Sequence, residues 1–425
     1  MSYNRRSVLQ GIGAMGATLA FSGLASAANG STRFIARVTN RGTERLERAG
    51  YTVHSSLAGG DIVLLSGDGT PEDIAAVRGV KTAAYDFEFE LESPAVTADV
   101  DVAMDDDFYD EYLWDKQIQE VKEAHEYATG TGRQIAVIDT GIDDTHPDLT
   151  VDTDASVSII DGDFGEHTGD VGDHGTHVAG TVAGNGTLGM LGTAPDATLL
   201  SVRIFDDDGG AAFGDVLLGM EYAASVGADA ANMSLGTPPI PPQENAAQYR
   251  RFMESVANGV TKEGTVLVGS AGNSDTSLQQ GGLFTLPNSL AGVVSVSASA
   301  PNDERAFYSN YGTNEVTVGA PGGGYETEAK TLSEDPAEVE WPFPLNLVFS
   351  TIPLDDGGYG WKAGTSMAAP QVAGLVALVR ELEPTTNARQ VTNAIAHGGQ
   401  GANGRSDDEF GAGRTNALET VRRLS

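Results

Sequence analysis

From residue 118 onward, short apolar runs rich in β-branched residues alternate with longer segments whose apolar residues recur at helical spacing. Strands buried on both faces and separated by helices pack stably only as a parallel sheet with helices on both sides. The sequence therefore predicts an α/β fold with a doubly wound parallel sheet. Strands are expected at 134–139, 198–205, 229–235, 265–269, 293–298 and 315–319. Helices are expected at 118–128, 213–225 and 243–261 and after residues 174, 366 and 387.

Three short segments, far apart in the chain, carry the residue types of a nucleophilic hydroxyl and its proton relay. Asp139 lies in AVIDTGID, His174 in DHGTHVAG and Ser366 in GTSMAAP. A serine nucleophile needs an imidazole to take its proton and a carboxylate to orient that imidazole. Asp139 ends a predicted strand, at the edge where open α/β sheets hold their ligand crevice. Each segment alone could be an ordinary turn, but the three together indicate a hydrolase.

The chain order Asp, His, Ser, together with SAGNS at 270–274, resembles the subtilisin-like serine proteases, peptidase family S8. The resemblance covers the chain from about residue 114 to the C-terminus. It implies a subtilisin-like sheet in which Asp139 orients His174, His174 is the general base, Ser366 is the nucleophile and Asn273 is the oxyanion donor.

The resemblance also implies two walls for the substrate residue before the scissile bond. One wall is Ser234, Leu235 and Gly236, and the other is Ser270, Ala271 and Gly272. Both are glycine-containing strand ends, against which a peptide could lie as an added strand. Plain strand ends that turn away from the sheet remain the alternative.

A calcium site is an open expectation. Asp148, in His146-Pro147-Asp148-Leu149, resembles a family aspartate that binds structural calcium with oxygens of a loop that here spans 184–192. The loop is one residue shorter than in well-known subtilisins, and Tyr109 falls near the place of an amide ligand. No cofactor is expected for catalysis.

Residues 28–105 read as a separate small α+β unit. Strands are expected at 33–39, 51–57, 61–66 and 80–91, with helices at 43–49 and from residue 71, which gives a ferredoxin-like βαββαβ order. Ahead of residues 106–425, such a unit resembles the inhibitory propeptide of the family. Cleavage is expected in the acidic loop at 102–110. An independent ligand-binding domain is the alternative.

The first 27 residues read as an export signal. Arg5 and Arg6 form a twin-arginine pattern, a modestly apolar stretch follows, and residues 25–27 form an A-x-A cleavage site. No other run approaches the roughly 20 apolar residues of a membrane span. We therefore expect a secreted protein, exported by the twin-arginine pathway and free of the membrane once the signal is removed.

The formal net charge of −35 sets the expected environment. The chain has 60 acidic side chains against 25 Lys and Arg, and the excess lies mainly after residue 105. Such a surface repels itself in dilute salt and disfavours nucleic acid or anionic membranes as partners. This acidic surface is similar to that of the halolysins, which are adapted to high salt. The alternative is an acidic protein whose charge serves only its solubility. The chain has no cysteine, so no disulfide can form.

These features together predict a secreted, self-processing serine endopeptidase adapted to high salt. Its expected partners are protein or peptide substrates and its own propeptide, and the mature enzyme is expected to be a monomer. The alternative from another class is a catalytically silent, propeptide-locked binding protein of the same fold.

Overall fold

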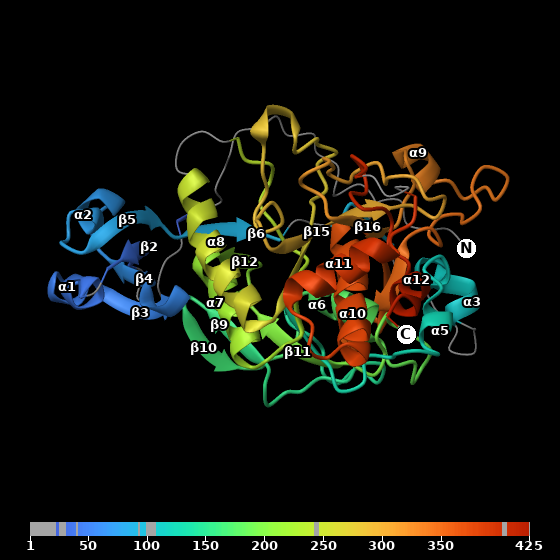
Figure 1. The fold of residues 1–425 in the computed structure, drawn as a ribbon, viewed down its shortest axis with the longest axis horizontal. Coiled ribbons are helices and arrows are strands. Elements are labelled where there is room, and N and C mark those ends of the chain that lie inside the picture. The colour runs from blue at the N-terminus through green and yellow to red at the C-terminus, as the bar shows by residue number, and fades with distance from the viewer. Residues whose placement is uncertain are drawn as a thin grey trace.

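The computed structural model describes residues 23–24, 31–39, 41–91, 94–98, 108–241, 246–401 and 406–424. The predicted export signal lies outside these ranges except for residues 23–24, so its paired arginines and cleavage site are not described. The described chain forms a large α/β body with a smaller N-terminal unit projecting from one end (Figure 1). No helix in the described ranges combines the length and apolarity needed to span a membrane.

An eight-stranded sheet forms the centre of the large body. Its order is β10-β9-β11-β8-β13-β14-β15-β16, and all strands run parallel except β10, which pairs antiparallel with β9. The expected parallel sheet is therefore confirmed. The bounds are β8 Gln134–Asp139, β9 Val157–Ile160, β10 Asp163–Glu166, β11 Thr198–Arg203, β13 Ala230–Met233, β14 Val266–Ser270, β15 Val293–Ser299 and β16 Val318–Pro321.

Alternate side chains of β8 enter two different cores, because successive residues of a strand point to opposite faces. Ile135 and Val137 pack with helices α6 and α10, whereas Ala136 and Ile138 pack with α7 and α8. Helices α11 and α12 pack outside α10. The bounds are α6 His174–Ala183, α7 Phe213–Ser225, α8 Ala246–Glu263, α10 Thr365–Leu382, α11 Ala388–Gly398 and α12 Ala417–Arg422.

Two small antiparallel sheets flank the central one. The first has the order β1-β6-β12, and the second has the order β17-β18-β7. Their bounds are β1 Gly23–Leu24, β6 Phe87–Glu90, β12 Gly210–Ala212, β17 Val348–Thr351, β18 Tyr359–Ala363 and β7 Val96–Ala98. Short helices complete this part of the fold: α9 Glu328–Thr331, η2 Gln280–Gly282 and η3 Leu354–Asp356.

The single helix expected at 118–128 is wrong. Within that range the structure has one short helix, α5 Val121–Ala124, which follows two others, α3 Phe108–Tyr112 and α4 Trp114–Gln117. Glu120 breaks the helical path before α5 with a φ of +55°. A buried polar cluster fixes the segment, since Lys116 and Gln119 both donate to the side-chain oxygen of Gln371. The apolar spacing alone gives no sign of these contacts.

The N-terminal unit has the predicted βαββαβ order in a four-stranded antiparallel sheet, β3-β4-β2-β5. One face of this sheet, including Phe34, Val63 and Leu65, packs on the unit's own helices. The bounds are β2 Thr32–Val38, α1 Gly42–Arg48, β3 Thr52–Leu57, η1 Ala58–Gly60, β4 Ile62–Gly67, α2 Pro71–Ala75 and β5 Val80–Tyr85.

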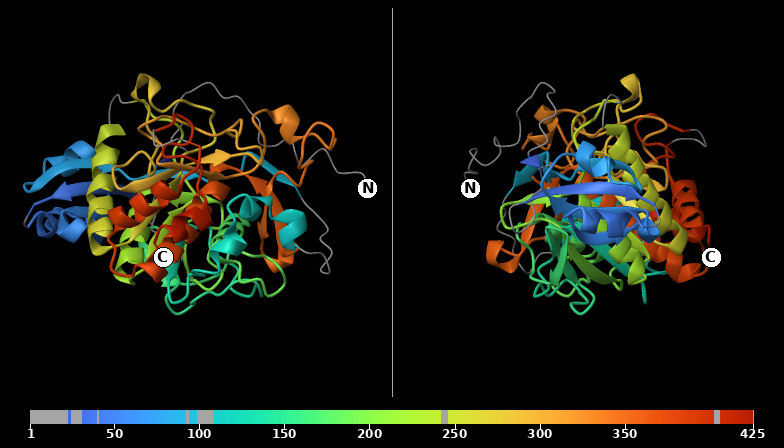
Figure 2. Two further views of the ribbon diagram at one scale, coloured as in Figure 1. Left: turned by 45° about the vertical axis from the view of Figure 1, so that its right-hand side comes forward. Right: turned by 90° about the vertical axis from the view of Figure 1, so that its left-hand side faces the viewer.

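The other face of the same sheet packs against the large body. Ile35, Ile62 and Leu64 join the core that contains α7 and α8, and the blue unit lies beside yellow α8 in both views (Figures 1 and 2). The last strand, expected to be continuous over 80–91, is split. The chain leaves the unit's sheet at Asp86, whose buried carboxylate faces Arg33, and then joins the large body as β6.

Candidate active site

Asp139 and His174 meet at the carboxyl edge of the central sheet. Asp139 is the last residue of β8, and His174 is the first residue of α6. His174 Nδ1 lies 2.8 Å from Asp139 Oδ1, and both side chains are buried. Because the carboxylate only accepts, Nδ1 is the donor of this bond, and in the tautomer that this bond selects Nε2 carries the lone pair. His174 Nε2 has no hydrogen-bond partner among the described residues, so it is available to accept a proton.

A second histidine lies one turn along the same helix. His177 Nε2 lies 3.1 Å from the carbonyl oxygen of Val348. Complete burial holds the pKa of His177 well below its usual range, and the nearby Lys362 and His174 lower it further. His177 therefore stays uncharged and adds no positive charge beside His174.

Ser366 lies in the first turn of α10, directly after Gly364 and Thr365. Its hydroxyl donates to the carbonyl oxygen of Ser234 at 3.2 Å, while the Ser234 hydroxyl donates to the carbonyl oxygen of Ser366 at 2.7 Å. In the described part of the chain no hydrogen bond joins Ser366 to His174. Catalytic hydrogen bonds often form only when substrate is bound, and rotation about the Cα–Cβ bond moves the Ser366 hydroxyl between staggered positions.

Asn273 is fixed beside Ser366 by Thr365. The Thr365 N–H and hydroxyl both donate to Asn273 Oδ1, each at 2.9 Å. With its oxygen held in this way, the carboxamide presents Nδ2 on its other side. A Cβ added to Gly364 would lie 3.5 Å from that nitrogen, so glycine keeps space open beside it. Thr365 carries no sequence signal beyond its place in the GTSM segment.

The two expected substrate walls lie side by side. Strands β13 and β14 pair in parallel up to Met233 and Gly269, so Ser234, Leu235 and Gly236 leave the sheet beside Ser270, Ala271 and Gly272. The Ser270 hydroxyl reaches the carbonyl oxygen of Leu235 at 3.5 Å.

Much of the second wall's backbone is already bonded within the fold. Ala271 donates to Val296, and Gly272 donates to Thr365 Oγ1. The carbonyl oxygen of Gly272 also accepts from Asn310.

The strand edges that receive an added strand in this structure are β12 and β18. Residues 88–90 pair antiparallel with 210–212, and residues 96–98 pair antiparallel with 361–363. The Ala95 N–H also donates to the carbonyl oxygen of Ala363 at 2.7 Å, three residues before Ser366. The sequence did not lead us to these edges. The run Gly209-Gly210-Ala211-Ala212, poor in side-chain atoms after a buried strand, is the signal that indicates one of them.

Asp148 is buried next to the loop at 184–192, as the resemblance implied, but that loop presents backbone N–H groups to its carboxylate. Calcium binds six to eight oxygen ligands. The arrangement around Asp148 does not fit a calcium ion.

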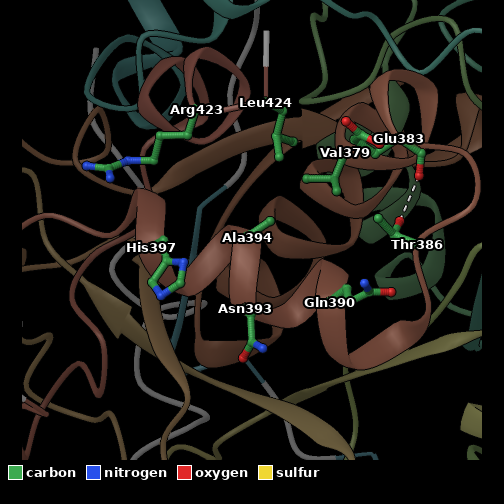
Figure 3. A pocket seen from close by; sticks show the side chains of 9 residues that line it. All are labelled: Val379, Glu383, Thr386, Gln390, Asn393, Ala394, His397, Arg423 and Leu424. Carbon is green, nitrogen blue, oxygen red and sulfur yellow. Dashed lines mark hydrogen bonds between the residues drawn. The ribbon is translucent and has the colours of Figure 1, made fainter.

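A cavity of about 530 Å³ lies at the far end of α10, away from Ser366. In Figure 3, Thr386 and Glu383 are joined by a hydrogen bond at its rim. None of the expected site residues lines this cavity. Its lining residues are Val379, Glu383, Thr386, Gln390, Asn393, Ala394, His397, Arg423 and Leu424.

Comparison with known proteins places the chain in a family. The sequence model of the Subtilase family matches residues 130–413. The chain belongs to the subtilase family. This subtilase is 33% identical to subtilisin BL of Lederbergia lenta over 295 residues, which are 69% of this chain and 92% of that protein. It is 31% identical to M-protease of Shouchella clausii over 363 residues, 85% of this chain and 80% of that protein.

Solved structures extend the likeness in fold to almost the whole chain. The epidermin leader peptide processing serine protease of Staphylococcus aureus matches this subtilase with a TM-score of 0.74 and 20% identity, covering 92% of this chain and 97% of that chain. Fervidolysin of Fervidobacterium pennivorans matches with a TM-score of 0.68 and 22% identity, covering 94% of this chain and 63% of that chain. As a subtilase, the protein is a serine endopeptidase whose substrates are proteins or peptides.

Proposed function

We propose that this subtilase is a secreted, self-processing endopeptidase adapted to high salt. In this proposal Asp139, His174 and Ser366 form the catalytic triad, and Asn273 is the oxyanion donor. The observation that carries the proposal is the 2.8 Å contact between Asp139 and His174 at the sheet edge, which leaves His174 Nε2 ready to accept a proton. No cofactor takes part in the chemistry.

The proposed reaction has two halves. The Ser366 hydroxyl transfers its proton to His174 Nε2 as its oxygen bonds to the substrate carbonyl carbon, and the resulting oxyanion accepts from Asn273 Nδ2. The C–N bond then breaks, and the amine leaves with the proton from His174. Water repeats the sequence on the ester of Ser366, which releases the acid and regenerates the serine.

Self-processing is supported by two stretches that follow the N-terminal unit in the chain. Residues 88–90 pair with β12, and residues 96–98 pair with β18, which ends three residues before Ser366. The N-terminal unit then acts as an inhibitory propeptide, and residues 95–98 lie against the strand that leads to Ser366. We place the cut between residues 91 and 96, upstream of the loop at 102–110 that the sequence suggested. Residues 102–107 of that loop are outside the described ranges, and 108–110 begin α3.

The remaining parts of the proposal rest on the sequence. Twin-arginine export follows from Arg5 and Arg6, and salt adaptation, similar to that of the halolysins, follows from the net charge of −35. We also propose that the mature enzyme is a monomer.

Labelling with a fluorophosphonate in about 3 M NaCl, where charge is well screened, tests the catalytic assignment. We expect one covalent adduct on Ser366, lost in the variants Ser366→Ala and His174→Ala and kept in the control His397→Ala, which lies at the distant cavity. A chain that never reacts, even after its N-terminal unit is removed by limited proteolysis, favours the silent binding protein instead.

A further inference from the structure

The Asp148 carboxylate is surrounded by hydrogen-bond donors. The Leu188 N–H donates to Oδ1 at 2.5 Å, while the Met190 N–H and the Tyr359 hydroxyl donate to Oδ2 at 3.2 and 2.6 Å. The Asp148 side chain is fully buried. Each carboxylate oxygen therefore has a donor supplied by the protein itself, and charge-assisted bonds of this kind are among the stronger hydrogen bonds.

This donor set is the reverse of what a cation requires. A calcium ion at Asp148 would need carbonyl or side-chain oxygens turned toward it. The amide groups at 188 and 190 instead present their positive ends, and the Tyr359 hydroxyl occupies the second oxygen. Among the described residues, no group of three or more His, Cys, Asp or Glu side chains could hold a metal ion.

Gly189 in the loop and the ring of Phe108 stabilise this arrangement. Gly189 has a φ of +129°, which favours glycine, and a Cβ there would lie 2.8 Å from the Phe108 ring. Phe108 also packs edge-on against Tyr359, at 5.2 Å between ring centroids. Glycine thus allows the turn that directs the Leu188 and Met190 N–H groups at Asp148, and the aromatic contact holds the Tyr359 ring.

We infer that this chain has replaced the cation at Asp148 with an internal set of donors, the Tyr359 hydroxyl and the two loop amides. The set ties the loop at 184–192 to the start of β18, the strand that leads to Ser366. The loop therefore keeps its shape without a metal ion. The inference concerns stability and does not depend on the proposed catalytic roles.

The test is thermal unfolding of the full chain carrying Ser366→Ala, so that any self-digestion through the proposed nucleophile is removed, in NaCl at constant ionic strength with either EDTA or CaCl₂. We expect no rise in Tm with calcium that depends on Asp148. In EDTA, Tyr359→Phe should lower Tm by roughly 2–4 °C, because a buried carboxylate loses a donor. The matched control is Tyr222→Phe, which removes a hydroxyl that donates to the neutral carbonyl oxygen of Ala155, and its loss should be smaller.

Each outcome of the calcium arm decides the inference. A calcium-induced rise in Tm that persists in Asp148→Asn shows a cation bound elsewhere and supports the inference. A calcium-induced rise in Tm that is lost in Asp148→Asn but kept in Tyr222→Phe overturns the inference. Terbium luminescence is an independent readout: a signal that calcium displaces and that requires Asp148 also overturns the inference, and its absence supports it.

Discussion

Arg33 of the N-terminal unit and Asp215 of α7 are joined by two buried hydrogen bonds, Nη2 to Oδ1 at 2.8 Å and Nη1 to Oδ2 at 3.3 Å. Arg33 Nη2 also lies 2.8 Å from Asp86 Oδ2, and its Nη1 lies 3.6 Å from the half-buried Asp161. One guanidinium thus faces three carboxylates where the N-terminal unit meets the large body. The two fully buried carboxylates depend on it for charge compensation.

Replacing Arg33 with alanine should destabilise this junction by about 3–5 kcal/mol, because two buried carboxylates lose the guanidinium that faces them. Denaturant unfolding of the Ser366→Ala chain measures the effect. The control is Arg48→Ala, since Arg48 pairs with Glu44 on the exposed surface and its removal should leave the transition in place. An Arg33→Ala chain that unfolds like its parent would show that the cluster contributes nothing to assembly.

The same cluster predicts a pH dependence. Burial raises the pKa of Asp215 to about 6, against the opposing effect of Arg33, and burial also raises the pKa of Asp86. A raised pKa means that the assembled chain binds the proton more tightly than the unfolded chain, where the value is 3.8. The stability that the assembled chain gains from protonating Asp215 is therefore fully present below pH 3.8. It is lost as the pH rises through about 6.

Asp215→Asn should remove that dependence. The amide keeps the shape of the side chain but does not titrate, so the difference in Tm between mutant and parent should shift in favour of the mutant as the pH rises from about 4 to about 6. Above that range the difference should stay constant. Parallel Tm-against-pH curves for the two proteins would contradict the assignment.

The sequence predicted the secondary structure and the central sheet better than it predicted the contacts between distant side chains. Strand β8 and helix α7 have the expected bounds, because buried β-branched runs and helical apolar spacing are local signals. The pairing of Arg33 with Asp215 spans 182 positions and leaves no local pattern. The sequence could not predict the donors around Asp148 for another reason. Whether a peptide group turns its N–H or its carbonyl oxygen toward a side chain depends on tertiary packing.

Ser366→Ala should remain full length when the protein is expressed and purified, because the proposed cut requires this hydroxyl. The parent should separate into two fragments, and intact mass spectrometry should place the cut between residues 91 and 96. Ser225→Ala, whose hydroxyl bonds only within its own helix turn, should mature normally. Fragments from purified Ser366→Ala would mean that another protease makes the cut.

Asn273→Ala should lower kcat by about 10²- to 10³-fold with little change in KM, the loss known for removing this kind of donor from a subtilisin. The reason is that the amide stabilises charge that develops only in the transition state. Thr365→Ala should give a smaller loss of the same kind, because Thr365 holds Asn273 in place through two hydrogen bonds, of which the variant keeps the backbone one. Asn302→Ala, a surface change, is the control. An increase in KM alone would point to a role in ground-state binding.

Activity should fall several-fold when salt is removed. With 60 acidic side chains against 25 basic ones, the folded chain is under strong self-repulsion, and the Debye length grows from about 3 Å at 1 M salt to about 30 Å at 0.01 M. Hydrolysis of an uncharged peptide, followed during dialysis and after return of salt, measures the effect without changing substrate charge. Because screening depends on ionic strength, NaCl and KCl should restore activity at equal concentrations. An enzyme equally active at both ends of this range would show that its charge serves some purpose other than tolerance of salt.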